Sequence, residues 1–490
     1  FAKAVYRSVG IRAPRGFAEL PYFFLIGGNG MAETMSNLAE LKAAANAASA
    51  AKTRLTYLFD EGKFTELDAY AASGKGLCGA VTAFGYVEGN PCYAFSQDVS
   101  VNKGALNKMQ ADKIAKVYDL AAKTGVPVVG IYDSCGADLN DGCEALAAYG
   151  ELLMWMSNLS GVVPQIAVVA GVCSGTSAML AESADFTIIA KDAELYCAPN
   201  AGVKSSSENA VKNGTAAILA DTDKDAVEAA KELLVRLPQN NISPVPMYEF
   251  DMPTAAAGKD AASQAEAVFD GGSVKELYAD FGKASYTALA TLGGATVGAV
   301  AVNKTADKLN ADDCTKIARF VRFCDSFAVP VITLVDTEGF AGDTDTEAAG
   351  AVKSMTKLVH AYAEATTIKI SVVTGKAYGP AFIALAGKGA NADLSYACED
   401  AVITALSPLT AAEFFYHDEL KGAEDVKAKR AELAARYCTE EGSAVKAAAK
   451  GCIDGVIPAN ALRNVLIDSI EVLAGKRISR LPKKHSNIQL

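Results

Sequence analysis

The chain has 490 residues, of which 51% are hydrophobic and 21% are charged, and its formal net charge is −11. This composition is typical of a large globular protein with enough residues for more than one domain. The acidic balance argues against sequence-independent binding of nucleic acid, which needs a basic surface, but it allows an anionic small substrate at a local positive patch.

The N-terminal residues 1–30 hold several basic side chains and then the apolar stretch "LPYFFLIGGNG" ahead of Met31. A basic stretch followed by a short apolar one faintly resembles a targeting peptide. We expect residues 1–40 to be a leader or an N-terminal extension, with a natural start at Met31.

An internal repeat organises the rest of the chain. "GVPVVGIYDSCGADLNDG" from Gly125 matches "AVPVITLVDTEGFAGDTD" from Ala328, and "IAVVAGVCSGTSAML" matches "ISVVTGKAYGPAFIA" further along. Each copy reads as an apolar strand, an Asp and a glycine loop, then a second strand, a Gly-x-x-x-Gly turn and a small-residue helix. Apolar strands that alternate with helices predict a largely parallel, buried sheet. We therefore predict one α/β domain written twice.

The two copies set the expected domain boundaries. The loosest composition lies in Leu237–Gly272, which contains "PQNNISPVP" and suits a link between domains. We assign residues 41–260 to the N-terminal domain and residues 261–490 to the C-terminal domain. After Ser407 the sequence becomes charged and is predicted to be helical.

The two glycine turns are the first candidates for chemistry. Gly171–Ser177 and Gly375–Ala381 each follow an apolar strand, and successive backbone N–H groups in such turns can stabilise charge on an oxygen. Acyl chemistry at a thioester needs such an oxyanion hole. The alternative is that these glycines only allow close packing of strand and helix.

A rival mechanism places a nucleophile at Cys173, because Gly171-Val-Cys-Ser-Gly loosely resembles the elbow of an α/β hydrolase. That mechanism needs a general base, usually histidine, and the chain has only His360, His417 and His485. None of them follows a convincing strand. Asp133 and Asp336, at equivalent strand ends, suit catalysis or turn capping equally well.

The cysteines also limit the possibilities. All eleven are scattered, with no Cys-x-x-Cys pair, which fits neither a zinc site nor a disulfide framework. We expect reduced thiols, a cytoplasmic location and no metal in this chain.

From about Arg54 onward the chain resembles the carboxyltransferase family of biotin-dependent acyl-CoA carboxylases and decarboxylases, of the propionyl-CoA carboxylase beta and methylmalonyl-CoA decarboxylase alpha type. The resemblance rests on motifs such as "YAFSQDVSV", "SGVVPQIAVVAGVCSG", "AVPVITLVDTEGF" and "GCIDGVIPANALR". It implies tandem duplicated crotonase-type domains of the ClpP/crotonase superfamily, with the acyl-CoA on the N-terminal domain. The biotin would bind on the C-terminal domain of a neighbouring subunit, in a homo-oligomer that is a dimer or a multiple of one.

The resemblance also implies the site residues. Backbone N–H groups of Gly175 and Thr176 would face the thioester, and those of Gly379 and Ala381 would face biotin. The substrate-binding residues would be Gly136, Ala137, Ser174, Gly339, Phe340, Tyr378 and Pro380.

The resemblance further implies partner chains. Biotin would arrive on a biotin carboxyl carrier protein, and the other partners would be a biotin carboxylase or membrane decarboxylase subunits, because the chain holds nothing similar to a biotin attachment segment. Such partners could place the protein at the periphery of a membrane.

Several positions depart from the family pattern. Thr176 and Ser177 stand where glycine and alanine are usual, Pro380 stands where glycine is usual, and Asp138 lies in a loop that usually holds arginine. A tryptophan-proline pair is replaced by Cys398 and Glu399. These departures leave open a catalytically weakened paralogue that acts as a structural or regulatory partner of an active homologue.

Overall fold

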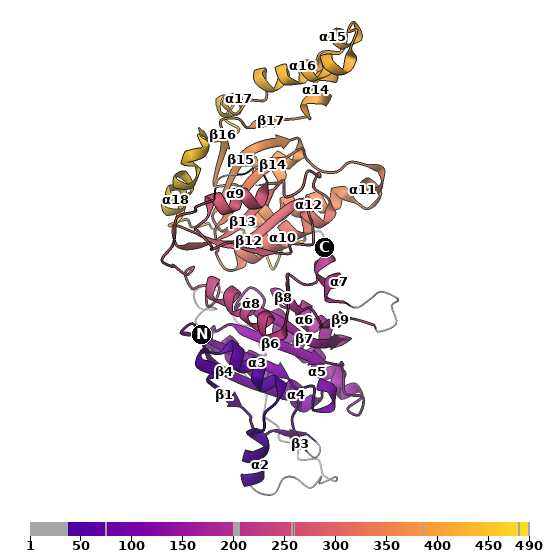
Figure 1. Cartoon of the computed structure of the whole chain (residues 1–490), viewed down its shortest axis with the longest axis vertical. Helices are drawn as coiled ribbons and strands as arrows, with labels where there is room; N and C mark the ends of the chain where they lie inside the picture. The colour runs from indigo at the N-terminus through magenta and orange to yellow at the C-terminus, as the bar shows by residue number, and fades with distance from the viewer. Residues whose placement is uncertain are drawn as a thin grey trace. The chain divides into compact units, whose positions relative to one another are not determined.

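The structure is a computed structural model that describes residues 38–73, 76–198, 206–255, 258, 260–385, 387–478 and 481–488. Of the leader or extension predicted at residues 1–40, residues 1–37 lie outside the described residues, and the last three begin helix α2. The described chain forms two compact units (Figure 1). Unit 1 runs to Ala210 and includes Ile218–Asn241, and unit 2 comprises Val211–Ala217 and the chain from Ile242 onward.

The sheet of unit 1 has the order β1-β4-β5-β6-β7-β8-β10, with β9 paired to the end of β7. Strands β1, β4 and β5 pair antiparallel, and every pair from β5 onward is parallel. The strands are β1 (Phe64–Leu67), β4 (Ala80–Val87), β5 (Asn90–Gln97), β6 (Val128–Ser134), β7 (Gln165–Ser174), β8 (Phe186–Ala190), β9 (Glu194–Tyr196) and β10 (Ile218–Ala220), besides the short hairpin of β2 (Ala72–Ser73) and β3 (Gly76–Leu77).

The helices of unit 1 connect and cover these strands. They are α2 (Leu38–Ala45), α3 (Ala50–Leu58), α4 (Lys108–Thr124), α5 (Cys143–Leu159), α6 (Thr176–Glu182) and α8 (Asp223–Arg236), with 3-10 turns η1 (Asp60–Gly62) and η2 (Asn102–Gly104). The Asn107 side chain accepts the Gln110 N–H and begins α4, and Gly125 ends it in the left-handed conformation. Helix α7 (Ser207–Lys212) carries the chain out of unit 1.

The sheet of unit 2 repeats this order as β11-β12-β13-β14-β15-β16-β18, with β17 paired to the end of β15. Its first two pairs are antiparallel and the later pairs are parallel, as in unit 1. The strands are β11 (Lys275–Leu277), β12 (Ser285–Leu292), β13 (Ala295–Val302), β14 (Val331–Thr337), β15 (Lys369–Tyr378), β16 (Leu394–Cys398), β17 (Val402–Thr404) and β18 (Gly455–Ile457).

The helices of unit 2 are α9 (Ala261–Val268), α10 (Ala311–Ser326), α11 (Thr344–Ala348), α12 (Ala351–Glu364), α13 (Pro380–Ala384), α14 (Pro408–Phe415), α15 (His417–Lys421), α16 (Val426–Glu440), α17 (Ala444–Ala449) and α18 (Leu462–Leu473), with 3-10 turns η3 (Lys388–Ala390) and η4 (Ala459–Ala461). Ala261, Ala265 and Phe269 in and beside α9 are fully buried against β12 and β13. Helices α14 to α16, the predicted charged helices, project from one end of this unit's sheet (Figure 1).

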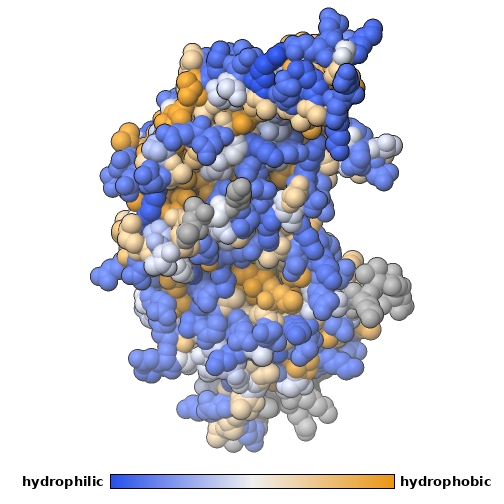
Figure 2. Space-filling model, turned by 45° about the horizontal axis from the view of Figure 1, so that its top comes forward, coloured by the Kyte–Doolittle hydropathy of each residue, from blue (hydrophilic) through white to orange (hydrophobic). Residues whose placement is uncertain are grey.

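The surface on the face drawn in Figure 2 is mostly hydrophilic, with separate apolar areas among the polar side chains. Within the described residues, no helix combines the length and the hydrophobicity needed to cross a membrane.

Candidate active site

The glycine turns after β7 and β15 have the same backbone conformation in both units. Gly175 has φ 59° and ψ −127°, and Gly379 has φ 59° and ψ −138°, values that a residue with a side chain rarely adopts. A helix starts directly after each glycine. The Gly175 N–H donates to the Tyr196 carbonyl at 3.0 Å, and the Gly379 N–H donates to the Thr404 carbonyl at 2.8 Å. The short strands β9 and β17 therefore fix the two turns.

These hydrogen bonds correct part of the predicted donor set. Gly175 and Gly379 were expected to give their N–H groups to the substrate or to biotin, but both N–H groups are already used within the fold. Their role is to shape the turn. The N–H groups of Thr176 and Ser177 in unit 1, and of Ala381 in unit 2, have no acceptor among the described residues.

A second loop approaches each turn from the neighbouring strand. Gly136 follows β6 with φ 108°, and Gly339 follows β14 with φ 109°. A Cβ atom built on either glycine would lie 3.4 Å from a backbone oxygen, that of Ser174 for Gly136 and that of Tyr378 for Gly339. Both glycines therefore let the loop lie close to the strand end just before the turn. Ser174 and Tyr378, which were predicted to bind substrate, supply the backbone oxygens that the loop glycines approach.

The hydrogen bonds of this loop leave one N–H free in each unit. The Gly136 N–H donates to Ser134 Oγ at 3.1 Å, and the Gly339 N–H donates to Thr337 Oγ1 at 3.2 Å. The N–H groups of the next residues, Ala137 and Phe340, have no acceptor among the described residues. Sequence reasoning placed both residues at the site but missed them as donors. Their matched position after the loop glycine of each repeat was the available signal.

Each unit thus offers free backbone N–H groups from two adjacent segments. In unit 1 they belong to Ala137, Thr176 and Ser177. In unit 2 they belong to Phe340 and Ala381, because Pro380, which corresponds to Thr176, has no N–H. Such paired donors can bind an oxygen that gains negative charge during a reaction.

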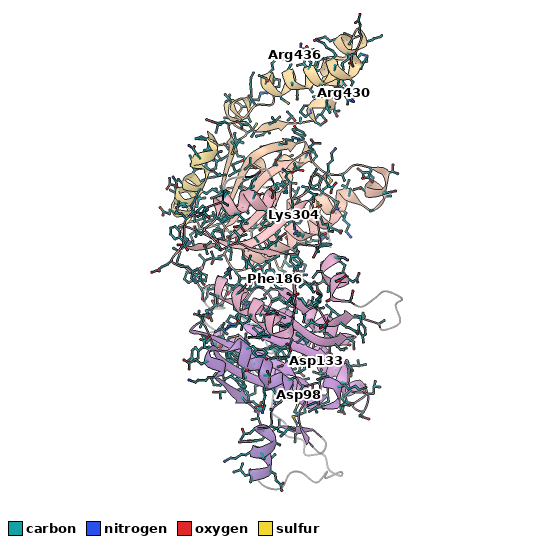
Figure 3. All side chains as sticks on the ribbon, in the orientation of Figure 1. Asp98, Asp133, Phe186, Lys304, Arg430 and Arg436 are labelled. Carbon is teal, nitrogen blue, oxygen red and sulfur yellow. The ribbon has the colours of Figure 1, made fainter. Side chains whose placement is uncertain are left out.

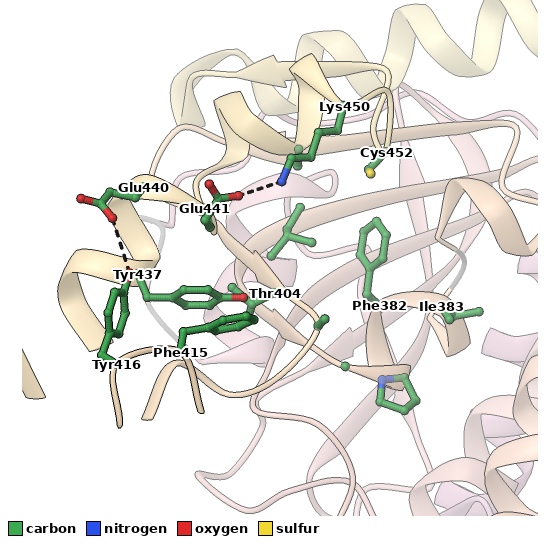
Figure 4. Close-up of a pocket in the computed structure, with 15 residues that line it drawn as sticks. Phe382, Ile383, Thr404, Phe415, Tyr416, Tyr437, Glu440, Glu441, Lys450 and Cys452 are labelled. Carbon is green, nitrogen blue, oxygen red and sulfur yellow. Dashed lines mark hydrogen bonds and ion pairs between the residues drawn. The ribbon is translucent and has the colours of Figure 1, made fainter. Parts of the chain in front are cut away.

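A cavity of about 940 Å³ adjoins the second turn within unit 2. Gly379 and Pro380 line it together with Phe382 and Ile383 of α13 and residues of α14, α16 and α17 (Figure 4). Phe415 and Tyr437 stack with ring centroids 5.8 Å apart on one wall. The lining also holds an ion pair in which Lys450 contacts Glu441 at 2.9 Å, so it combines aromatic and aliphatic side chains with charged ones.

Asp133 and Asp336 are part of the scaffold behind the two turns. Asp133 lies on the sheet of unit 1 (Figure 3), and Arg54 Nη1 contacts its carboxylate at 2.9 Å. In unit 2 the carboxylate of Asp336 accepts the Lys376 N–H and an amide N–H of Asn303, each at 2.8 Å. A Cβ on Gly171 would come 2.3 Å from the Asp133 carboxylate, and one on Gly375 would come 2.4 Å from that of Asp336.

The first glycine of each Gly-x-x-x-Gly turn is therefore required by close packing against an aspartate. The alternative expected from the sequence was close packing of strand and helix; the contact found is instead with a carboxylate of the neighbouring strand, β6 or β14.

Cys173 cannot act as the nucleophile of the hydrolase mechanism. Its side chain is fully buried in β7, and burial raises the pKa of the thiol, with the Asp133 charge adding to the effect. A reactive thiol needs the opposite environment, one that is exposed and electropositive. The residue at the turn is Gly175, and the hydrolase interpretation is wrong.

Two equivalent α/β units, each with a strand–turn–helix that presents backbone N–H groups, define the class of a duplicated fold built for oxyanion chemistry. The chain belongs to the carboxyl transferase domain family, which matches residues 44–488.

Individual relatives support this assignment. The chain is 34% identical to the carboxyltransferase subunit of propionyl-CoA carboxylase from Haloferax mediterranei, over 90% of this chain and 93% of the relative. It is 32% identical to the alpha subunit of methylmalonyl-CoA decarboxylase from Propionigenium modestum, with the same coverage. The solved structure of transcarboxylase 12S with methylmalonyl-coenzyme A bound matches with a TM-score of 0.84 and 31% identity, over 92% of this chain and 94% of that chain. The predicted family and the tandem crotonase-type fold are confirmed.

Proposed function

We propose that this chain transfers a carboxyl group between biotin, carried on a partner protein, and the α-carbon of an acyl-CoA thioester. The observation that carries the proposal is the repetition of one arrangement in both units. Free N–H groups of a glycine loop and of a glycine turn occur in unit 1 at Ala137, Thr176 and Ser177, and in unit 2 at Phe340 and Ala381. A transfer between two carbonyl compounds needs two such holes.

In unit 1 the proposed ligand is the thioester. When the α-carbon of an acyl-CoA gains or loses a carboxyl group, negative charge develops on the thioester oxygen as the enolate forms. The N–H groups of Ala137 and Thr176, which are partly exposed, would stabilise that oxygen more strongly in the transition state than in the bound substrate, with the fully buried Ser177 behind them. The proton exchanged at the α-carbon would be given or taken by the biotin ring nitrogen that exchanges the carboxyl group, so the site requires no side chain to act as an acid or a base.

In unit 2 the proposed ligand is biotin, and the residues present fit it. The aromatic wall of Phe415 and Tyr437 and the side chain of Ile383 suit a compact, mostly apolar bicyclic ring, and Gly379 and Pro380 of the turn line the same cavity. Biotin, when bound, supplies the nitrogen that carries the carboxyl group. The protein residues would hold its ring and polarise its carbonyl.

The testing experiment removes one donor by a substitution that the fold already accepts elsewhere. Thr176→Pro places in unit 1 the residue that unit 2 has at the same point, after a glycine of nearly identical conformation. We expect decarboxylation of methylmalonyl-CoA in the presence of free biotin to fall by about 10²–10³ in kcat. Thr176→Ala, which keeps the N–H, is the matched control and should retain activity within a few fold.

Equal activity of Thr176→Pro and Thr176→Ala would contradict the proposed oxyanion hole. A wild-type chain that decarboxylates no malonyl-type thioester with biotin, although correctly folded, would contradict the function itself.

A second candidate function is that of a weakened paralogue that supports an active homologue. One observation favours it: Pro380 removes an N–H from the hole proposed for biotin. Transfer of label from carboxylated acyl-CoA to biotin by the pure chain would exclude this candidate.

The partners and the location follow from the proposed reaction. We propose that a biotin carboxyl carrier protein and either a biotin carboxylase or membrane decarboxylase subunits assemble with this chain in the cytoplasm. Two relatives are named as subunits, and the solved structure of transcarboxylase 12S is described as a hexamer assembly, which supports an oligomer. We expect a dimer or a multiple of one, which light scattering can measure.

A further inference from the structure

Three buried hydroxyl groups form a chain behind the first oxyanion turn. Tyr149 Oη of α5 lies 2.5 Å from Ser177 Oγ of α6, and the Ser177 hydroxyl donates to Ser134 Oγ of β6 at 3.2 Å. Ser134 Oγ also accepts the Gly136 N–H at 3.1 Å. Tyr149, Ser134 and Ser177 are all at most 1% exposed.

The direction of this chain is fixed by counting protons. Ser134 gives its own proton to the Gly136 carbonyl at 3.4 Å and accepts that of Ser177, which leaves the Tyr149 hydroxyl to donate to Ser177. Burial raises the pKa of Tyr149 to about 12, against the opposing effect of its hydrogen bonds to Ser177 and Ser134, so this donor keeps its proton at physiological pH.

The hydroxyl chain joins both segments that supply the free N–H groups. At one end, Ser134 holds Gly136, the residue before Ala137. In the middle, Ser177 belongs to the turn and carries one of the free N–H groups itself. Tyr149 anchors the hydroxyl chain to the long helix α5. The position of the Ala137 N–H relative to the Thr176 and Ser177 N–H groups therefore depends on side chains that no substrate touches.

Unit 2 lacks this connection. Thr337 Oγ1 accepts the Gly339 N–H as Ser134 does in unit 1, but Ala381 stands in place of Ser177 and has no hydroxyl. Tyr362 of α12 bonds Thr333 instead, at 2.9 Å, and both are fully buried. The connected turn is therefore a property of unit 1 and not of the repeated fold.

We propose that Ser177 and Tyr149 are positioning residues for the acyl-CoA half of the reaction. They set the spacing of the N–H groups of the loop and the turn around the thioester oxygen. This inference rests on the proposed function. It predicts that breaking the hydroxyl chain changes the polarisation of the thioester carbonyl without weakening the binding of the CoA portion.

The test compares Ser177→Ala, Tyr149→Phe and the double variant with Tyr362→Phe, which removes an equally buried tyrosine hydroxyl from unit 2. The first readout is the infrared carbonyl stretch of ¹³C-labelled propionyl-CoA bound to each folded full-length protein. The second is kcat and KM for decarboxylation of methylmalonyl-CoA with free biotin. Melting temperatures identify the fraction of each variant that is folded.

We expect the wild-type carbonyl frequency to lie below that of free propionyl-CoA, and to return toward the free value in Ser177→Ala and Tyr149→Phe. Their kcat should fall about 10- to 100-fold with KM nearly unchanged, because misplaced donors affect the transition state most. The loss of kcat in the double variant should be no larger than that in Ser177→Ala, because both substitutions break the same hydroxyl chain. Tyr362→Phe should leave the carbonyl frequency at the wild-type value.

Two results would overturn the inference, and they differ. If the wild type lowers the carbonyl frequency and Ser177→Ala lowers it equally with unchanged kcat, the hydroxyl chain is only structural and the proposed function stands. If the wild type neither shifts the carbonyl frequency nor turns over the substrate, the proposed function fails and this inference fails with it.

Discussion

Replacing Pro380 by glycine would give the turn of unit 2 the N–H group that Thr176 has in unit 1. Pro380 is exposed and begins α13, where its fixed φ suits the first helical position and its missing N–H costs no helical hydrogen bond. The proline is therefore harmless to the fold. It matters only if the turn donates to the biotin carbonyl.

The magnitude follows from the donors that remain. Loss of one oxyanion donor typically costs about 10²–10³ in turnover, or about 3–4 kcal/mol. The Phe340 and Ala381 N–H groups are still free in unit 2, so part of this stabilisation is already present. We expect Pro380→Gly to raise carboxyl transfer to biotin by about 10- to 100-fold, while acyl-CoA binding to unit 1 stays unchanged.

The assay is transfer of ¹⁴C-carboxyl from labelled methylmalonyl-CoA to free biotin at saturating biotin. Glycine loosens the unfolded chain, so rates must be compared at matched folded fraction. Pro380→Ala supplies the same N–H with less backbone freedom and should match Pro380→Gly. If neither variant transfers faster than wild type, the missing donor was never part of the site and the proline is only a helix start.

Further predictions concern the scaffold of the two turns and the C-terminal segment. Arg54→Met should lower the free energy of unfolding in urea by about 3–5 kcal/mol, because it leaves the buried Asp133 carboxylate without its charge partner. The double variant Arg54→Met, Asp133→Asn should recover part of this loss. If the losses of the two substitutions simply add, this account is contradicted. Gly375→Ala should reduce stability more than Gly342→Ala, because its Cβ would meet the Asp336 carboxylate at 2.4 Å whereas nothing lies within 4 Å of a Cβ on Gly342. Burial alone would raise the pKa of Glu364, but hydrogen bonds from Lys483 and Ser486 and the charges of Lys483 and Arg322 lower it to about 2. A lowered carboxyl pKa contributes stability above about pH 4.5, and this stability is lost as the pH falls toward 2. Because Lys483 donates to Glu364, hydrogen exchange of residues 481–488 should become faster in that pH range. The Glu364→Gln variant should show no such pH dependence.

The repeat made most of the fold predictable from sequence. Each predicted central strand is present, as β6 and β14 show, because a run of apolar β-branched residues between two helices can be satisfied only inside a sheet covered on both faces. The turn glycines were also found, because a residue at φ 59° before a helix is almost always glycine.

The donors themselves were harder to predict, because hydrogen bonds between distant segments decide which N–H groups are free. Gly175 loses its N–H to Tyr196, and Gly379 loses its N–H to Thr404, through short strands that sequence patterns do not locate. The contact of Arg54 with Asp133 joins residues far apart in the chain and has no local signal. The hydroxyl chain of Tyr149, Ser177 and Ser134 joins three elements and is visible only once they are packed.

The two units share a backbone but differ at the two residues that follow the turn glycine. Thr176 and Ser177 give unit 1 two free N–H groups and a hydroxyl that ties them to the loop, whereas Pro380 and Ala381 give unit 2 one N–H and no tie. An enolate oxygen carries nearly a full charge and needs closely spaced, fixed donors. The ureido oxygen of biotin would also gain negative charge when the carboxyl group leaves the ring nitrogen, because the electron pair left on that nitrogen delocalises onto the oxygen, and unit 2 has fewer free N–H groups to stabilise it. On this argument the two copies of the fold differ in their donors and not in their architecture, and the proposed biotin half is the one that a restored N–H at position 380 should improve.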